Sequence, residues 1–183
     1  MRVILDGPDG GGKSTTAEGL RSIFQIPVIK YTVPESDEEL RDRIERTLLF
    51  GMSAPIILDR WHYPADMIYC DIVEQRQSSI LEYGPRLMEW LLKNDVLYVY
   101  LTARPDVLVQ RHTGAPNDYV QPEQLEAIAQ QYEDWMQLLL DQGVGVARID
   151  TTAISRSAAL CAAGRAIVDY YAARYYNVVR LND

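Results

Sequence analysis

The chain of 183 residues has a mass of 20.8 kDa, a length that suits one domain with a sizeable core over residues 1–183. No apolar stretch is long enough to span a bilayer, Met1-Arg2 opens no signal-peptide pattern, and the net charge of −8 disfavours a broad surface for duplex DNA. We therefore expect a cytoplasmic protein with no membrane partner. Cys70 and Cys161 are expected to be buried small apolar residues in a reducing compartment, since they form no zinc pattern.

The first predicted element is a short strand, Val3–Leu5, and the sequence GPDGGGKS follows it at Gly7–Ser14. This spacing is typical of a phosphate-binding loop, in which backbone N–H groups cradle phosphate oxygens. The alternative is a plain glycine-rich turn, but a helix over Thr15–Phe24 would also direct its positive N-terminal end at the same anion. The sequence therefore predicts that ATP binds at Gly7, Asp9, Gly10, Gly11, Gly12, Lys13, Ser14 and Thr15. In this interpretation Lys13 reaches the outer phosphates and Ser14 ligates Mg²⁺.

Downstream, short apolar runs alternate with segments of helical periodicity. Strands are predicted at Pro55–Arg60, Val96–Leu101 and Gly145–Ile149, and the second of these is apolar or aromatic throughout, as in a central strand. Helices are predicted from a capping box at Ser36–Glu39, from the end of the Pro55–Arg60 strand to about Ser79, from Pro122 onward, and over Ala158–Tyr175. Gly84-Pro85 is expected to separate the second of these from a further short helix that ends near Leu92. This alternation indicates an α/β fold with a parallel sheet covered on both faces.

Asp59 and Arg60 form a second candidate site because they end an apolar strand. At the carboxyl end of a parallel strand, side chains project into the crevice where such sheets bind ligands. Asp59 could hold Mg²⁺ or accept a proton from an attacking hydroxyl, and Arg60 could counter phosphate charge with its planar fork. The alternative interpretation is a surface ion pair at a strand end. The predicted phosphate-binding loop at Gly7–Ser14 favours a role in the site over this alternative.

Three motifs together resemble the thymidylate kinase-like nucleotide kinases, particularly the small phage forms. They are the loop Gly7–Thr15, the run Asp59-Arg60-Trp61-His62-Tyr63, and Arg111 within Val107–Arg111; the resemblance covers residues 2 to about 154. It implies a three-layer P-loop kinase fold with a five-stranded parallel sheet of order 2-3-1-4-5 and a lid over about residues 111–121. It also implies ATP and Mg²⁺ as cofactors, and a host-cytoplasmic location if the gene belongs to a phage.

The resemblance also assigns roles to individual residues. Lys13, Asp59, Arg60 and Arg111 would be catalytic, and Ser14 and Asp59 would ligate the metal. Asp9 would face the sugar of the acceptor, Arg60 its phosphate, and Arg111 the phosphoryl group in transfer. The segment Ile149–Ala153 would hold adenine.

The sequence departs from this family between Phe50 and Pro55, where thymidylate kinases carry a longer helical region with a base-stacking aromatic residue and a further arginine. Phe50 could replace the aromatic residue or be a core residue at a helix end. A cluster of three arginines could clamp a phosphate or lie on a solvated helix face through ordinary i,i+4 pairs, Asp37–Arg41 and Glu39–Arg43. The cluster is Arg41, Arg43 and Arg46.

Other conspicuous side chains have two interpretations each. Trp61, Tyr63 and Tyr69 could stack on a base or pack in the core. His62 could be an acid or base, or a hydrogen-bonded loop residue. Asp66 could share carboxylate chemistry with Asp59 or cap a helix that begins there. The tyrosines at 170, 171, 175 and 176 could be core and rim of the last helix or the contact of a homodimer.

The predicted function is transfer of the γ-phosphoryl group of ATP to a deoxynucleoside monophosphate. The alternative acceptor is a neutral hydroxyl, on a deoxynucleoside or on 5-hydroxymethyluracil in phage DNA, and only this alternative gives DNA as a partner. A regulatory NTP-binding switch is a third hypothesis, although the sequence lacks GTPase specificity motifs. The monophosphate is preferred because of extra positive charge at Arg41–Arg46, Arg76 and Arg86.

Overall fold

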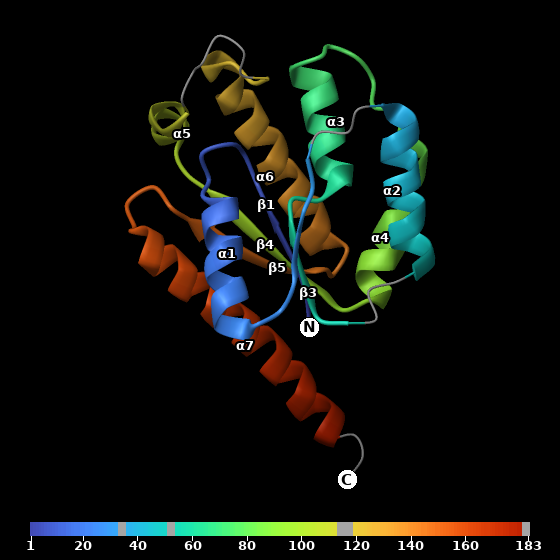
Figure 1. Ribbon diagram of the computed structural model, residues 1–183, viewed down its shortest axis with the longest axis vertical. Helices are drawn as coiled ribbons and strands as arrows, with labels where there is room; N and C mark the ends of the chain where they lie inside the picture. Colours follow the sequence, from blue (N-terminus) through green and yellow to red (C-terminus); the bar gives the residue numbers. More distant parts are fainter. Residues whose placement is uncertain (33–35, 51–53, 113–118, 181–183) are drawn as a thin grey trace.

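Five parallel strands form one sheet in this computed structural model, which describes residues 1–32, 36–50, 54–112 and 119–180, without the side chains at 49–50 and 176–180. The strand order is β2-β3-β1-β4-β5, as the family resemblance implied (Figure 1). The strands are β1 (Arg2–Asp6), β2 (Val28–Lys30), β3 (Ile56–Asp59), β4 (Val96–Thr102) and β5 (Gly145–Asp150). Because all pairs are parallel, the carboxyl ends of β1, β3 and β4 meet at one edge of the sheet.

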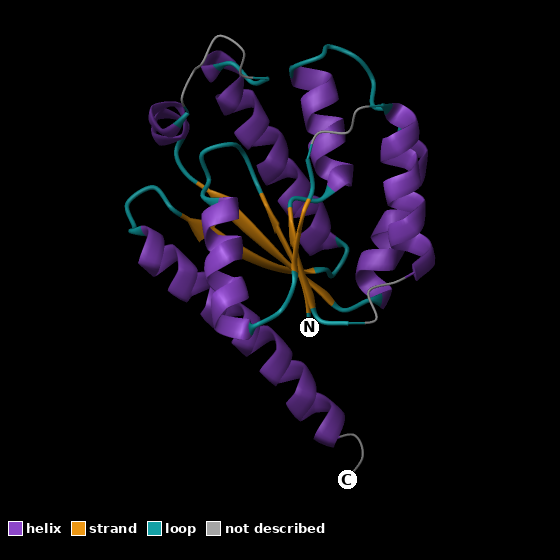
Figure 2. Cartoon of the chain, in the orientation of Figure 1, coloured by secondary structure: helices purple, strands orange, loops and turns teal. Residues whose placement is uncertain are grey.

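Helices cover both faces of the sheet and give three layers (Figure 2). One face packs against α1 (Lys13–Phe24) and α7 (Arg156–Arg180). The other packs against α2 (Asp37–Phe50), α3 (His62–Ile72), α4 (Gly84–Lys93), α5 (Pro105–Arg111) and α6 (Leu125–Asp141). Two short 3₁₀ turns, at Leu81–Tyr83 and Pro122–Gln124, precede α4 and α6.

Strand β4 shows why this sheet needs helices on both sides. Successive side chains of a strand point to opposite faces, so an all-apolar strand must be covered twice. Tyr98 and Tyr100 join the core beneath α3 and α6, whereas Val99 and Leu101 join the core beneath α1 and α7. All seven residues of β4 are buried, which confirms the prediction of a central strand.

The phosphate-loop helix and the capping box agree closely with the sequence. Helix α1 begins at Lys13, two residues before the predicted start, and ends at Phe24 as predicted. Helix α2 follows Ser36, whose hydroxyl accepts a hydrogen bond from the backbone N–H of Glu39 at 3.2 Å. This bond satisfies one of the first N–H groups of the helix, which have no partner within it.

Several boundaries differ from the predictions. Helix α3 ends at Ile72 rather than near Ser79, because the chain turns back there with Gln75 in the left-handed region. Gly84-Pro85 begins α4 instead of separating it from the helix before, since proline suits a first helical turn. The last helix is longer than Ala158–Tyr175 at both ends.

Strand β2 was not located in the sequence, and one cysteine was placed wrongly. β2 has three residues and its last two are exposed, so it carries little apolar pattern. Cys70 is buried as expected, but Cys161 is exposed on α7 because it lies on the side of the helix away from the sheet.

The tyrosines of α7 divide between its two sides. The Tyr170 hydroxyl donates to the Asp95 carboxylate at 3.1 Å, and the Tyr171 hydroxyl donates to the Arg2 carbonyl at 2.6 Å, whereas Tyr175 is 69% exposed. Tyr176 lies outside the described side chains. The homodimer stays a prediction. No helix within the described part of the chain is both long and apolar enough to cross a membrane.

Candidate active site

The predicted phosphate-binding loop connects β1 to α1 at the carboxyl edge of the sheet and lines a cavity of about 540 Å³, the loop cavity. Its walls include seven of the eight predicted ATP-binding residues, those from Asp9 to Thr15. Gly7 does not line the cavity; it turns the chain with φ of 135°, and a Cβ there would lie 2.1 Å from the Leu101 carbonyl oxygen. Only glycine avoids that overlap, so Gly7 shapes the loop from beneath.

Lys13 lies within the loop rather than in solvent. Its side chain is 4% exposed, and its ammonium donates a hydrogen bond to the Pro8 carbonyl at 2.6 Å. Burial is the largest cause that lowers the Lys13 pKa from 10.5 to about 8, and the charge of Arg60 lowers it further. An anionic phosphate in the loop cavity would relieve both effects.

Asp59 offers a buried oxygen that suits the predicted metal. It ends β3 and is 2% exposed, and its Oδ1 atom has no hydrogen-bond partner among the described residues. Ser14 is exposed in the first turn of α1 and lines the loop cavity. A carboxylate and a hydroxyl are the hard oxygen ligands that Mg²⁺ prefers, so the residues present fit the ion.

Arg60 and Asp9 form an ion pair where the loop faces the end of β3. Arg60 has φ of 74°, a left-handed backbone that is uncommon without glycine, and its N–H donates to the Leu5 carbonyl at 2.8 Å. The Tyr69 hydroxyl donates to Asp9 at 3.0 Å and accepts a longer bond of 3.4 Å from Arg60. Although burial acts to raise it, the charges of Lys13 and Arg60 hold the Asp9 pKa below its ordinary value.

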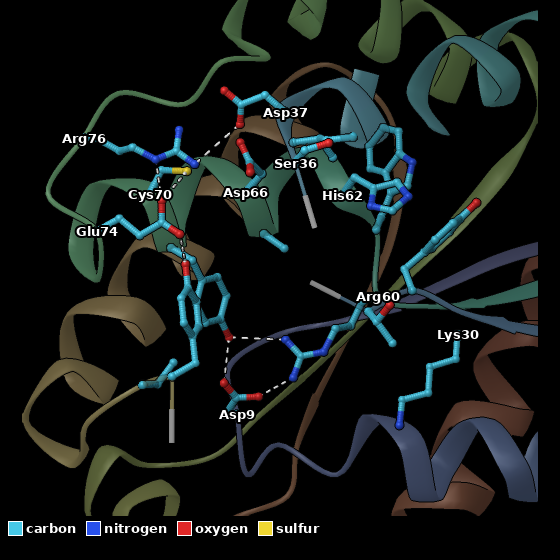
Figure 3. A pocket seen from close by; sticks show the side chains of 18 residues that line it. Asp9, Lys30, Ser36, Asp37, Arg60, His62, Asp66, Cys70, Glu74 and Arg76 are labelled. Atoms are coloured by element: carbon cyan, nitrogen blue, oxygen red, sulfur yellow. Dashed lines mark hydrogen bonds and ion pairs between the residues drawn. The ribbon is translucent and has the colours of Figure 1, made fainter. Parts of the chain in front are cut away.

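A second, larger cavity of about 720 Å³ adjoins this pair (Figure 3). Asp9 and Arg60 line both this second cavity and the loop cavity. Its other walls come from the end of β2, the start of α2, one face of α3, and the segments that contain Arg76 and Tyr119. The arrangement gives two adjoining cavities with one ion pair at their junction.

The aromatic candidates divide between the second cavity and the core. Trp61 and Tyr69 line the cavity, although they are 1% and 7% exposed. Tyr63 packs edge-on against Trp135, with ring centroids 5.4 Å apart, and does not line the cavity. His62 also lines it, as a buried residue rather than a loop residue.

Asp66 does not cap a helix, because α3 already begins at His62. Instead it points from the middle of α3 into the second cavity and accepts a hydrogen bond from the Ser78 hydroxyl. The structure therefore separates it from Asp59, which ends β3 and does not line this cavity. The two carboxylates therefore do not line the same cavity.

Arg111 lies at the wall of the loop cavity, where the family resemblance placed a catalytic arginine. Its guanidinium donates to the Gly10 carbonyl at 3.2 Å and to the Thr151 hydroxyl at 2.8 Å. Residues 113–118 of the predicted lid lie outside the described chain. Thr151, from the segment predicted to hold adenine, lines the loop cavity, and so does Ile154 just beyond that segment.

The arginine cluster does not reach the second cavity, and this corrects one premise of the sequence analysis. Arg43 pairs with Glu39, and Arg46 pairs with Asp42 at 2.8 Å, as on a solvated helix face. Arg41 does not line the cavity, and the expected partner of Arg41, Asp37, lies 3.7 Å from Arg76 instead. Arg86 is held by Glu45 at 2.9 Å, so only Arg76 of these arginines lines the cavity. The side chain of Phe50 lies outside the described residues.

Sequence reasoning missed Asp6 and Lys30. The Asp6 carboxylate is fully buried and accepts hydrogen bonds from the N–H groups of Gly7 and Trp61 and from the hydroxyls of Tyr98 and Tyr132. It ends an apolar strand as Asp59 does, so the same rule could have found it. Lys30 carries no comparable signal, since it is placed by the pairing of β2 with β3.

Comparisons with known proteins find similarity to a prophage protein and to several kinases. No protein-family model matches it. It is 27% identical over 135 residues to the SPbeta prophage-derived uncharacterized protein YorR of Bacillus subtilis, a match that covers 73% of this chain and 81% of YorR. It is 32% identical over 93 residues to the adenylate kinase of Petrotoga mobilis, covering 49% of this chain and 41% of that enzyme.

Solved structures share the fold at low sequence identity. The crystal structure of YorR in complex with phosphorylated GDP matches with a TM-score of 0.71 and 20% identity, over 93% of this chain and 98% of that one. Deoxyadenosine kinase of M. mycoides with the products dCMP and dCDP matches with a TM-score of 0.65 and 13% identity, over 92% and 99%. A gluconokinase of Sinorhizobium meliloti matches with a TM-score of 0.61 and 16% identity, over 96% of each chain.

Proposed function

We propose that the chain is a P-loop nucleotide or nucleoside kinase, a proposal supported by its similarity to an adenylate kinase and to a deoxyadenosine kinase, and that it transfers the γ-phosphoryl group of ATP to a deoxynucleoside monophosphate. One observation carries the proposal: Asp9 and Arg60 line both the loop cavity and the second cavity. A donor nucleotide in the loop cavity and an acceptor in the second cavity would meet at that pair. Positioning two reactants in this way accounts for much of the catalysis of phosphoryl transfer.

The residues of the loop cavity supply positive charge where the transferring group would lie. Lys13 offsets charge on the outer phosphates, and Arg111 reaches the same cavity from the end of α5. Ser14 and Asp59 would hold Mg²⁺, which neutralises phosphate charge and aligns the phosphates when it is bound. Closure by the segment after Arg111 is the role that the family resemblance gives to the lid.

A monophosphate acceptor is supported by two cations that line the second cavity. Arg60 and Lys30 both line the second cavity at the end near the loop (Figure 3). A phosphate acceptor is already an anionic nucleophile, so it needs its repulsion from ATP screened more than it needs a base. The guanidinium of Arg60 and the ammonium of Lys30 could provide that screening.

A neutral hydroxyl acceptor is favoured by a different observation. Arg60 is already paired with Asp9, and the second cavity is lined by four carboxylates against the three cations Lys30, Arg60 and Arg76. The carboxylates are Asp9, Asp37, Asp66 and Glu74. A hydroxyl needs a carboxylate to take its proton, and Asp9 lies at the junction where that group would react. The deoxyadenosine kinase structure, which holds the product dCMP, adds support for a nucleoside acceptor.

The test is a screen of ATP consumption with deoxynucleosides, their monophosphates and DNA that contains 5-hydroxymethyluracil. We expect transfer to a monophosphate, and we expect Arg60→Ala to lower kcat/KM for that acceptor by roughly 10²-fold or more, since it removes a charge-assisted contact at the reacting group. Arg86→Ala is the matched control, because Arg86 pairs with Glu45 and lines neither cavity.

Each other result of the screen has a defined meaning. Transfer only to a nucleoside or only to DNA would move the proposal to the hydroxyl acceptor and make Asp9 or Asp59 its base. No transfer to any acceptor, with the protein folded and ATP bound, would overturn the kinase function.

A further inference from the structure

The end of the second cavity that lies away from the phosphate loop carries more carboxylates than cations. We call it the distal end and define it by Ser36, Asp37, Asp66, Cys70, Glu74 and Arg76, which line the cavity. Figure 3 shows these side chains grouped opposite Asp9 and Arg60. Three of the six are carboxylates, and Arg76 is the one cation among them.

The distal end is where the base of an acceptor would lie, an inference that rests on the proposed kinase function. The reacting hydroxyl or phosphate must approach the outer phosphate of ATP, so it lies at the junction marked by Asp9 and Arg60. The rest of the acceptor then extends away from the loop. A cavity of about 720 Å³ is within the range of pockets that enclose small ligands of this size.

The positive charge of Arg76 is already shared between carboxylates. Its Nε atom donates to Glu74, and its guanidinium lies 3.7 Å from Asp37. The hydrogen bond from the Tyr119 hydroxyl is the main cause that holds the Glu74 pKa below its ordinary value, and the hydrogen bond from Arg76 lowers this pKa further. Glu74 is therefore ionised near neutral pH and can only accept hydrogen bonds.

Asp66 also presents acceptor capacity to a ligand. It points into the cavity from α3, and the described contact to its Oδ2 atom is a hydrogen bond from the Ser78 hydroxyl. The Cys70 thiol also forms a hydrogen bond with this carboxylate. A carboxylate has about four acceptor positions on its two oxygens, so these two bonds leave capacity for a further donor. Neighbouring acceptors of this kind require a ligand whose edge supplies N–H groups.

His62 gives an independent sign that a polar ligand binds in this cavity. Its side chain is 6% exposed and lines the cavity, and its Nε2 atom has no hydrogen-bond partner among the described residues. Burial is the main cause that lowers the His62 pKa to about 4, so the imidazole is neutral near pH 7. Buried polar atoms are rarely left without a partner unless a bound group or water completes them.

The five common bases differ in the donors that they could offer to these carboxylates. Guanine, cytosine and adenine carry an exocyclic amino group, and guanine adds a ring N–H beside it. Thymine and uracil present a single ring N–H between two carbonyl oxygens, and those oxygens would face carboxylates. We propose that the base of the acceptor carries an exocyclic amino group, with Asp66 and Glu74 as the residues that select it.

The experiment compares kcat/KM for ATP-dependent phosphorylation of the same acceptor type with each base. We expect amino-bearing bases, guanine first, to exceed thymine and uracil by roughly 10- to 100-fold, the range that one or two selective base contacts provide. Asp66→Asn replaces one acceptor oxygen with a donor, so it should lower this ratio by roughly tenfold or more.

The matched control is Asp71→Asn on the same helix. Asp71 lies outside the second cavity and accepts a hydrogen bond from Gln131 at 2.6 Å, so its replacement should leave the base ratio unchanged. If Asp66→Asn does not fold, Glu74→Gln at the partly exposed rim provides the same measurement, with the same expected loss of ratio.

The outcomes separate this inference from the proposed function. Equal or greater activity on thymine, uracil or 5-hydroxymethyluracil would overturn the base selection while leaving the kinase function intact. If no acceptor is phosphorylated, the kinase function fails, and equilibrium binding of the nucleosides decides the base selection. Binding can be measured by quenching of tryptophan fluorescence, since Trp61 lies at the cavity wall. Equal affinity for all bases would then overturn the base selection.

Discussion

The Asp6 carboxylate accepts a hydrogen bond from the backbone N–H of Trp61 at 3.3 Å, which ties the end of β1 to the segment after β3. The same carboxylate accepts a bond of 2.9 Å from the N–H of Gly7, the first residue of the phosphate loop. One buried side chain therefore fixes the loop relative to Asp59 and Arg60. The hydroxyls of Tyr98 and Tyr132 complete its hydrogen bonding from β4 and α6.

Asp6→Asn should destabilise the protein and misplace the loop. The amide offers an N–H₂ group where all four partners are donors, so at least one buried donor loses its acceptor, at a cost of about 1–3 kcal/mol. Urea unfolding measures the lost stability, and kcat measures the misplacement. A variant with unchanged stability and activity would show that the four bonds do not position the site.

Gly7→Ala should abolish ATP binding while it lowers the stability of the fold much less. An alanine Cβ would lie 2.1 Å from the Leu101 carbonyl oxygen, and φ of 135° is unfavourable for alanine. Either the loop or the end of β4 must move, and the loop is the smaller unit. Titration with ATP measures the loss.

Gly164→Ala on α7 is the control for that substitution. The nearest atom to a Cβ there is Leu20 Cδ2 at 3.9 Å, an ordinary contact, and alanine suits a helix interior. It should leave ATP binding unchanged and add about 0.5–1 kcal/mol of stability. Equal ATP affinity of the Gly7→Ala and Gly164→Ala variants would contradict the assignment of the loop.

The sequence predicted what depends on local pattern and missed what depends on pairing at a distance. The Gly7–Ser14 loop and the all-apolar β4 are continuous stretches with a clear signal, and both lie where they were expected. β2 is a three-residue edge strand, and it forms because β3 supplies its hydrogen-bond partners. No apolar pattern of its own marks it.

The second cavity is also formed by contacts between residues far apart in the sequence, which local patterns do not predict. Asp59-Arg60 was recognised as a motif, but the pairing of Arg60 with Asp9 joins residues 51 positions apart. The preference of Arg43 for Glu39 is local, and the i,i+4 rule predicted it. Arg76 reaches the cavity only because the chain turns after α3, where the sequence had predicted continued helix.

Arg111→Ala should lower kcat more than it weakens ATP binding. Its guanidinium is held at the wall of the loop cavity by Gly10 and Thr151, where it can meet charge that develops in the transition state. Loss of one such contact lowers kcat by roughly 10²- to 10³-fold. Steady-state kinetics and equilibrium ATP binding measure the two effects separately.

Arg104→Ala is the control for Arg111. It lies beside α5, pairs with Asp106 at 3.0 Å and does not line the loop cavity. Its kcat should match the wild type. If Arg111→Ala also kept wild-type kcat, Arg111 would have only a structural role at Gly10 and Thr151.

Lys13→Met should abolish transfer and leave the protein folded. Methionine fills a similar buried volume but removes the charge that offsets the outer phosphates. The expected result is no measurable turnover with any acceptor that the wild type uses, together with an unchanged far-UV spectrum. Wild-type turnover in this variant would remove Lys13 from the catalytic residues.

The same lysine predicts opposite effects of pH on activity and on stability. Burial is the main cause that lowers the Lys13 pKa to about 8 in the folded protein without ligand, against 10.5 for an exposed lysine. Since kcat/KM reports the free enzyme, its value for ATP should fall as the pH rises through about 8, because the ammonium that binds phosphate loses its proton.

Stability should change in the other direction. Between about pH 8 and 10.5 the unfolded chain holds a proton on Lys13 that the folded chain has released, so the free energy of unfolding rises with pH relative to Lys13→Met. The full difference of about 2.5 pH units corresponds to at most about 3 kcal/mol. Urea unfolding of both proteins is measured at pH 7.5, just below that window, and at pH 10, within it. The difference in unfolding free energy between the two proteins at each pH cancels the contribution of other titrating groups. A difference that is flat with pH would mean that Lys13 keeps its proton, and the fall in kcat/KM would then need another cause.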